Sequence, residues 1–130
     1  ADYGSPAYGS AIIVNPSFAA ASPQAVRDFL VATIDGVRAS AKNPASAIDT
    51  VLARLDSGVR ELELERLRTT LRGNILTDDV RREGLGAITP ERFDASIEAI
   101  GADYKFRRRP VLTDIFDGAF LPPASARKVN

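Results

Sequence analysis

The first clear hydrophobic signal is a run of four apolar residues near the start of the chain: Ala11, Ile12, Ile13 and Val14. Glycine and serine precede this run, and asparagine and proline follow it. A short run rich in β-branched residues between such neighbours predicts a buried strand. The rest of the chain gives no equally clear strand signal, so we expect the strand to pair with residues outside this chain or with a second copy.

After the strand, apolar residues recur at intervals of three and four, which predicts helices. Three helices begin with a polar residue followed by proline: Ser22-Pro23, Asn43-Pro44 and Thr89-Pro90. The polar residue suits the N-cap, and proline suits the first helical position because its missing N–H is not needed there. The predicted apolar stripes are Val26, Phe29, Leu30, Ile34 and Val37; Ala47, Ile48, Val51, Leu52 and Leu55; and Phe93, Ile97 and Ile100.

A further helix is predicted over residues 59–72, with Leu64, Leu67 and Leu71 as its stripe and Gly73-Asn74 as its end. Its outer face, RELELERLR, alternates charges at helical spacing. This pattern favours a solvated face with ion pairs inside the helix over a face that binds a partner.

Two glycine positions carry specific expectations. Gly36 lies inside the first long predicted helix, where glycine costs about 1 kcal/mol relative to alanine, and a close approach by another element would explain it. Gly84 and Gly86 flank Leu85 ahead of the helix at Pro90. A phosphate-binding loop would need a preceding strand and further polar residues, so this segment is interpreted as a turn.

The C-terminal third contains a basic cluster, YKFRRRPVL, in which aromatic residues stand among lysine and arginine. Such clusters can bind single-stranded nucleic acid, but a solvated loop ending at Pro110 is the preferred interpretation. One short helical turn capped by Thr113 is predicted next. Residues 124–130 follow Pro122-Pro123 and are expected to fray.

Composition narrows the classes of function. Seventeen basic and seventeen acidic residues give a net charge of zero, which argues against binding nucleic acid or anionic lipid through the overall field. Cysteine and histidine are absent, which excludes disulfides, thiolate metal sites and histidine-based catalysis within this chain. No apolar run approaches the roughly 20 residues of a membrane span, and no signal peptide is recognisable. Methionine is also absent, so we expect the chain to be part of a longer protein.

The order of these segments resembles one protein family over about residues 1–123. The matching segments are a Tyr-Gly step and the strand AIIVN, then SPQAVRDFLVATIDGVRASAKNPASAI, GLGAITPERFDASIEAIG and FDGAFLP. The chain is similar to the C-terminal part of periplasmic solute-binding proteins of ABC importers. Within that family it resembles the branch for nitrate, sulfonates, taurine and thiamine-pyrimidine precursors.

The resemblance implies a fold class that is mainly α with one or two short strands, as a C-terminal fragment of a two-lobed α/β binding protein of type II. Residues 1–18 would form the hinge and strand, residues 22–123 the helical part of a lobe, and residues 124–130 a tail. The implied function is capture of a small polar solute for a membrane permease in the periplasm, with no enzymatic activity and no cofactor. Tyr3, Ser5 and Tyr8 lie near the expected crossover between lobes and are the candidate ligand contacts, because tyrosine can stack on a flat ring and donate its O–H. Packing of the hinge by the two tyrosines is an equally good interpretation.

Two other classes of function stay open at this point. A biosynthetic enzyme of the same fold makes the thiamine-pyrimidine precursor, but its chemistry relies on histidine, which this chain lacks. A helical interaction module would use RELELERLR or KFRRR to recognise a partner. We also expect self-association through the exposed strand at residues 11–14.

Overall fold

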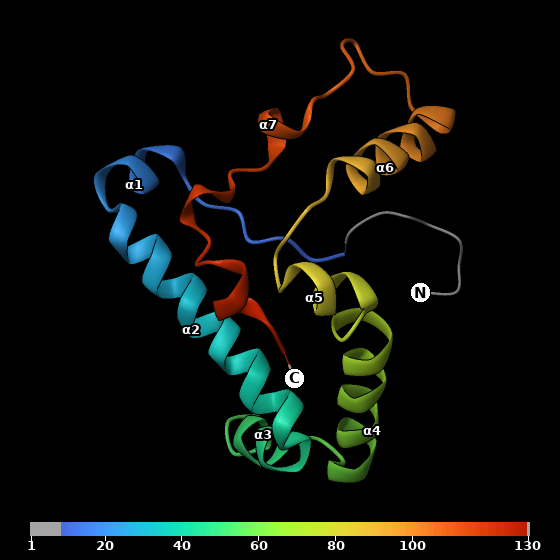
Figure 1. Cartoon of the computed structure of the whole chain (residues 1–130). Helices are drawn as coiled ribbons and strands as arrows, with labels where there is room; N and C mark the ends of the chain where they lie inside the picture. Colours follow the sequence, from blue (N-terminus) through green and yellow to red (C-terminus); the bar gives the residue numbers. More distant parts are fainter. Residues whose placement is uncertain (1–8, 130) are drawn as a thin grey trace.

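The computed structural model describes residues 9–129, which are 68% helical and contain no strand (Figure 1). The mainly α class expected from the sequence is therefore confirmed, while the binding-protein fold itself stays a prediction. The elements in chain order are α1 (Pro16–Ala21), α2 (Pro23–Lys42), α3 (Pro44–Leu52), α4 (Arg60–Thr70), the π-helical turn η1 (Leu71–Ile75), α5 (Asp78–Glu83), α6 (Pro90–Asp103), α7 (Leu112–Ile115) and the 3₁₀ turns η2 (Gly118–Phe120) and η3 (Ala124–Arg127).

The strand expected at residues 11–14 is wrong for this chain. The segment is irregular and solvent-exposed, and within residues 9–129 no other segment forms a ladder with it. A strand needs a neighbour to bind its N–H and C=O groups, and the described residues contain no second sheet-forming segment. The apolar run itself is present, but residues 9–129 supply no strand for it to pair with.

Local capping explains where most helices begin. The Asn15 side chain accepts hydrogen bonds from the N–H groups of Ser17 (2.8 Å) and Phe18, and so caps α1. Asn43 caps α3 and Thr89 caps α6 in the expected way, each through its side-chain oxygen. Ser22 differs, because its side chain makes no cap bond to α2. Its backbone N–H instead closes α1 on the carbonyl of Phe18.

The helix α7 also begins differently from the prediction. Thr113 lies inside the helix, and the Asp114 carboxylate accepts the N–H of Val111 (3.1 Å) at the start. The helical segment that includes α4 also ends later than expected. The prediction ended it at Gly73-Asn74, whereas the π-helical turn η1 continues it to Ile75. α5 had no counterpart in the predicted elements; the Thr77 hydroxyl caps it by accepting the N–H of Val80.

The predicted apolar stripes are only partly covered. The buried apolar residues are Ala19, Val26, Ile34, Ile48, Leu71, Phe93, Ile97 and Val129. Phe29, Val51, Leu55 and Ile100 belong to the same predicted stripes but are exposed. No large side chain within the described residues is completely enclosed. The helices therefore have apolar faces that are wider than the contacts this chain supplies.

The helices form an open arrangement (Figure 1). α2 packs against α3, and α3 packs against α4. From α4 the chain continues through η1 to α5. α6, the following loop and α7 extend away from this group. The last residues of the chain pass between α2 and α5. Within residues 9–129 the helices therefore pack on one another and not on a sheet.

The charged face of α4 is solvated, as the alternating sequence indicated. Arg66 pairs with Glu63 (2.6 Å) and Arg72 pairs with Glu65 (3.2 Å), so much of the charge is neutralised within one helix and its continuation. Leu64 and Leu67 are half-buried on the opposite side. This pairing is typical of a surface helix and needs no partner protein.

Candidate functional site

The three predicted ligand contacts, Tyr3, Ser5 and Tyr8, lie outside the described residues. The structure therefore does not test them. The candidate sites that can be built from residues 9–129 are a hollow beside α6 and a buried contact at the C-terminal end of the chain.

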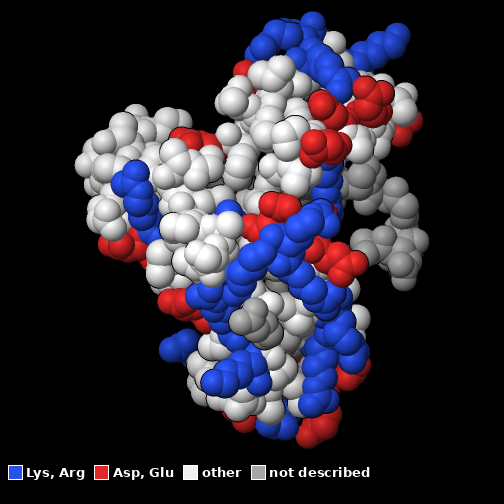
Figure 2. All heavy atoms as spheres, viewed as in Figure 1, with Lys and Arg blue, Asp and Glu red and all other residues white. Residues whose placement is uncertain are grey.

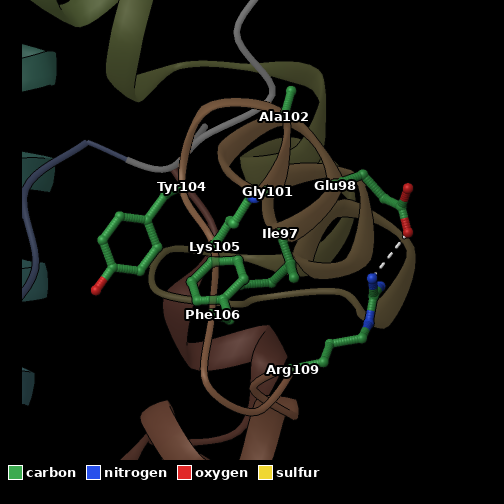
Figure 3. A pocket seen from close by; sticks show the side chains of 8 residues that line it. All are labelled: Ile97, Glu98, Gly101, Ala102, Tyr104, Lys105, Phe106 and Arg109. Carbon is green, nitrogen blue, oxygen red and sulfur yellow. Dashed lines mark hydrogen bonds and ion pairs between the residues drawn. The ribbon is translucent and has the colours of Figure 1, made fainter.

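The hollow lies at the C-terminal end of α6 and has a volume of about 660 Å³ (Figure 3). It forms where the chain leaves α6 at Tyr104 and turns back across the end of the helix. Its lining consists of Ile97, Glu98, Gly101, Ala102, Tyr104, Lys105, Phe106 and Arg109. Of these residues only Ile97 is buried, so the hollow is a shallow surface feature.

Two aromatic rings shape one side of the hollow. The ring centroids of Tyr104 and Phe106 are 5.2 Å apart in an edge-to-face arrangement. Phe106 packs toward α6 at Gly101, where a Cβ atom would lie 3.7 Å from the ring. The Tyr104 hydroxyl points away from the other labelled residues, and the residue is exposed (Figure 3). An edge-to-face pair of this kind holds the loop against the helix.

Two cations line the hollow, Lys105 and Arg109, and Arg109 is already engaged by two carboxylates. Its guanidinium donates to Glu98 (2.8 Å) and to Asp94 (3.2 Å), both on α6. Hydrogen bonding by Glu98 and then by Asp94 raises the pKa of Arg109 further above its ordinary value. An anionic ligand would have to compete with both carboxylates for Arg109, which leaves Lys105 as the lining cation without an ion pair among the described residues.

The basic cluster predicted as a solvated loop is exposed, and this expectation is confirmed for Lys105, Arg107, Arg108 and Arg109. Figure 2 shows this positive group at the upper end of the molecule, beside the acidic residues of α6 and α7. Arg108 pairs with Asp114 (2.9 Å), as Arg109 pairs with α6. Lys105 and Arg107 make no ion pair with the residues that the structure describes. Half of the cluster is therefore neutralised locally.

The second candidate site is a set of contacts that we call the C-terminal clasp, formed by Arg38, Arg127 and Lys128. The Arg127 guanidinium is buried, with 9% of the residue exposed, and donates to the carbonyls of Pro122 (2.8 Å) and Leu85 (2.5 Å). The Leu85 N–H donates in return to the Arg127 carbonyl (2.9 Å). A buried arginine of this kind is stable only because its donors are satisfied.

The other two members of the clasp extend it to α2 and α5. Arg38 of α2 donates to the carbonyls of Lys128 (2.9 Å) and Ala126 (2.7 Å). The Lys128 ammonium donates to the carbonyls of Arg81 (2.7 Å) and Arg82 at the C-terminal end of α5. A cation at this end of a helix also interacts favourably with the helix dipole. The clasp therefore connects three segments that are far apart in sequence.

The clasp overturns one prediction and explains another feature. Residues 124–129 do not fray, because their carbonyls and cations find partners and Val129 is buried. Gly84 and Gly86 form the predicted turn with positive φ values of 83° and 75°. At Gly84 a Cβ atom would lie 2.9 Å from the Cβ of Arg127, so the turn also needs glycine to let the tail approach.

Sequence reasoning missed the clasp, although one signal was available. Arg38 occupies a position three or four residues from Ile34 and Ala41, on the side of α2 that faces the protein. A basic residue within an apolar stripe indicates a specific polar partner. At Gly36 the close approach that would explain the glycine is not found, since no other segment of the described residues lies within 4 Å of a Cβ atom placed there.

α5 and α6 are joined by a charged group outside both candidate sites. The Asp79 carboxylate contacts Arg92 of α6 (2.5 Å) and Arg82 of its own helix (2.5 Å). The hydrogen bond from Arg92, followed by that from Arg82, lowers the pKa of Asp79 below its ordinary value. The group holds the start of α6 in place and brings no unpaired charge into a cleft.

Within residues 9–129 no group of acidic, histidine or cysteine side chains is arranged to hold a metal ion. None of the described helices combines the length and apolar character needed to cross a membrane. Comparison of the chain with protein-family models, curated proteins and solved structures found no match. The functional assignment therefore depends on the residues and their arrangement alone.

Proposed function

We propose that this chain is the helical part of one lobe of a solute-binding protein of an ABC importer, which captures a small polar solute for a membrane permease. The observation that carries the proposal is the segment of residues 11–14, which is apolar, exposed and without a partner strand in the described part of the chain. It directly precedes α1 and α2, in the order that the family resemblance requires. In such a lobe a sheet would bind this segment and cover the helices behind it.

The incomplete burial of the helices supports the same proposal. Phe29 of α2 is 58% exposed although it belongs to the same stripe as the buried residues Val26 and Ile34. Val51 of α3 and Leu55, which follows that helix, are exposed as well. Helices that cover a sheet in an α/β lobe carry such apolar faces, and these faces are exposed to water when the sheet is absent.

The helical interaction module is a weaker alternative. Its two candidate surfaces are RELELERLR and KFRRR, and ion pairs within the chain neutralise a large part of each. A partner-binding surface would present charges that are free to contact the partner. The alternative enzyme would still need histidine from elsewhere.

The proposal is tested by adding nitrate, taurine or a thiamine-type pyrimidine to the ¹⁵N-labelled chain and recording amide shifts. A lobe that holds only part of a ligand site is expected to bind weakly, with a Kd on the order of 1 mM or above, which this measurement detects. We expect at least one of these solutes to shift amides within residues 3–18. Tyr3→Ala and Tyr8→Ala should abolish the shifts, because these side chains are the proposed contacts.

The third tyrosine of the chain provides a matched control. Tyr104→Ala removes an exposed tyrosine beside the hollow of α6 and should leave the shifts of residues 3–18 unchanged. Shifts that centre on the hollow and disappear with Tyr104→Ala would place the binding elsewhere and contradict the proposed site. Absence of any shift up to about 50 mM solute, with the helical spectrum intact, would contradict the proposed function.

A further inference from the structure

The N-terminal described segment has an unusual surface. Residues 9–26 contain no charged side chain, and Ile12, Ile13 and Phe18 are at least half exposed within them. Ile13 is the extreme case, with 93% of the residue exposed. Soluble monomers rarely keep a continuous apolar segment of this kind open to water. We call residues 10–18 the uncharged segment.

The total surface of the chain is also too large for a compact monomer. Its solvent-accessible surface is 9427 Å², whereas a compact monomeric protein of 13.9 kDa exposes about 6,700 Å². The excess of roughly 2,700 Å² exceeds the 800 Å² or so that each partner buries in a standard interface. Burial of this area in one interface of ordinary size would therefore still leave the chain with more exposed surface than a compact monomer of its mass.

We propose that two copies of this 130-residue chain, where no sheet of the proposed lobe binds residues 11–14, associate through the uncharged segment, with residues 11–14 of each copy paired as antiparallel strands about a two-fold axis. The second copy provides what the segment lacks: an unpaired strand edge and an equally uncharged apolar surface. A net charge of zero leaves no long-range repulsion between copies. The contact is self-complementary, so both strands obtain their hydrogen bonds from the same interface.

The positively charged surfaces of the chain lie elsewhere and are not the ones expected to bind the second copy. Figure 2 shows positive groups at the loop after α6 and in a band near α5 and the C-terminal clasp, whereas the region over α1 is largely uncharged. A charged partner would be drawn to the first two surfaces. The uncharged segment instead fits a partner with the same apolar character.

Analytical ultracentrifugation of the purified 130-residue chain tests the proposal directly. We expect a species of twice the monomer mass that dissociates on dilution. Ile13→Lys should weaken the association by about ten-fold or more, because it places two like charges at the paired strands. Val59→Lys is the matched control, since Val59 is also an exposed apolar residue but lies before α4, and this variant should dimerise normally.

Engineered cysteines locate the axis, because the chain has no cysteine of its own. In a symmetric antiparallel pair, the residue on the axis faces its own copy at a Cα distance of about 4.5–5.5 Å, which a disulfide can bridge. We expect Ile12→Cys or Ile13→Cys to give a nearly complete cross-linked dimer on mild oxidation. Val59→Cys should remain uncross-linked under the same conditions.

Several results would overturn the proposal. A monomer at all concentrations would do so, and amide protection of residues 11–14 in that monomer would show that residues 1–8 of the same chain cover the segment. Equal cross-linking of Val59→Cys would show association without a defined interface. A dimer that Ile13→Lys leaves intact would place the contact on another surface.

Discussion

The two ends of the described chain reverse the usual relation between residue type and burial. At the N-terminal end, Ile13 is 93% exposed although its sequence context is apolar. At the C-terminal end, Arg127 is only 9% exposed although its context is polar. The difference follows from partners: the backbone and guanidinium of Arg127 find acceptors and donors within this chain, whereas the segment around Ile13 finds none in its described part. Burial depends on what is available to pack against, as well as on hydrophobicity.

The comparison also separates the contributions of the two ends to stability. The C-terminal clasp joins α2, α5 and the turn at Leu85, so its loss should loosen the whole molecule. Residues 11–14 of the uncharged segment are exposed, so substitutions of their side chains should affect association and leave folding nearly unchanged. The following predictions test this separation.

Arg127→Ala should have the largest effect. The substitution removes donors from the carbonyls of Pro122 and Leu85 and leaves both acceptors in a partly buried place. Hydrogen bonds to charged groups contribute about 1.5–3 kcal/mol, so we expect a loss of about 3 kcal/mol in the free energy of unfolding. Urea denaturation followed by circular dichroism measures this change. Arg107→Ala, an exposed arginine, should change stability by less than about 0.5 kcal/mol, and an equal loss in both variants would contradict the role of the clasp.

Gly84→Ala should have the next largest effect, because it disturbs the clasp through the backbone. Gly84 has a φ of 83°, and a Cβ atom there would lie 2.9 Å from the Cβ of Arg127. Strained backbone of this kind costs on the order of 1–3 kcal/mol. The same denaturation experiment should show this loss, and a variant as stable as the parent would mean that the tail does not lie against this turn.

The sequence predicted the helices of this chain better than it predicted their surroundings. Cap-proline pairs and three-and-four spacing indicate α2, α3 and α6 because these signals depend on residues a few positions apart. Burial of Phe29 and formation of a strand at residues 11–14 depend on distant elements, and there the structure differs from the pattern: Phe29 is exposed and residues 11–14 are irregular. The clasp was missed for the same reason, since its bonds join residues up to 90 positions apart.

The candidate site was predictable to a smaller extent. Tyr3, Ser5 and Tyr8 were chosen through a family resemblance, and they lie outside the described residues. The hollow beside α6 arises from a turn of the chain after Tyr104, which no periodic pattern specifies. Its charge balance was equally hidden, because Arg109 pairs with carboxylates that lie 11 and 15 positions away.

Gly36→Ala should act in the opposite direction to Gly84→Ala. Gly36 lies inside α2 with open space around the position of a Cβ atom. Alanine is favoured over glycine in a helix interior by about 1 kcal/mol, so we expect the free energy of unfolding to rise by up to that amount. A loss of stability would indicate that another copy or another segment packs closely against α2 at this point. The pair of glycine variants therefore distinguishes a helix that is open from a turn that is covered.

Substitution of Asp79 should produce the smallest effect and should be visible mainly as a change in pH dependence. Arg92 and Arg82 lower the pKa of Asp79 below its ordinary value of 3.8. A carboxyl whose pKa is lower in the folded state stabilises the fold above its unfolded pKa, and this contribution is lost as pH falls through the folded pKa. Below about pH 4 the stability of Asp79→Asn should thus fall less steeply than that of the parent chain.

Asp78→Asn is the matched control, because Asp78 is the neighbouring aspartate, is highly exposed and pairs only with Arg81 among the described residues. If both variants keep the acid-side slope of the parent, the contact between α5 and α6 does not depend on the Asp79 charge, and the buried residues Phe93 and Ile97 of α6 contribute more to its position than this charge does.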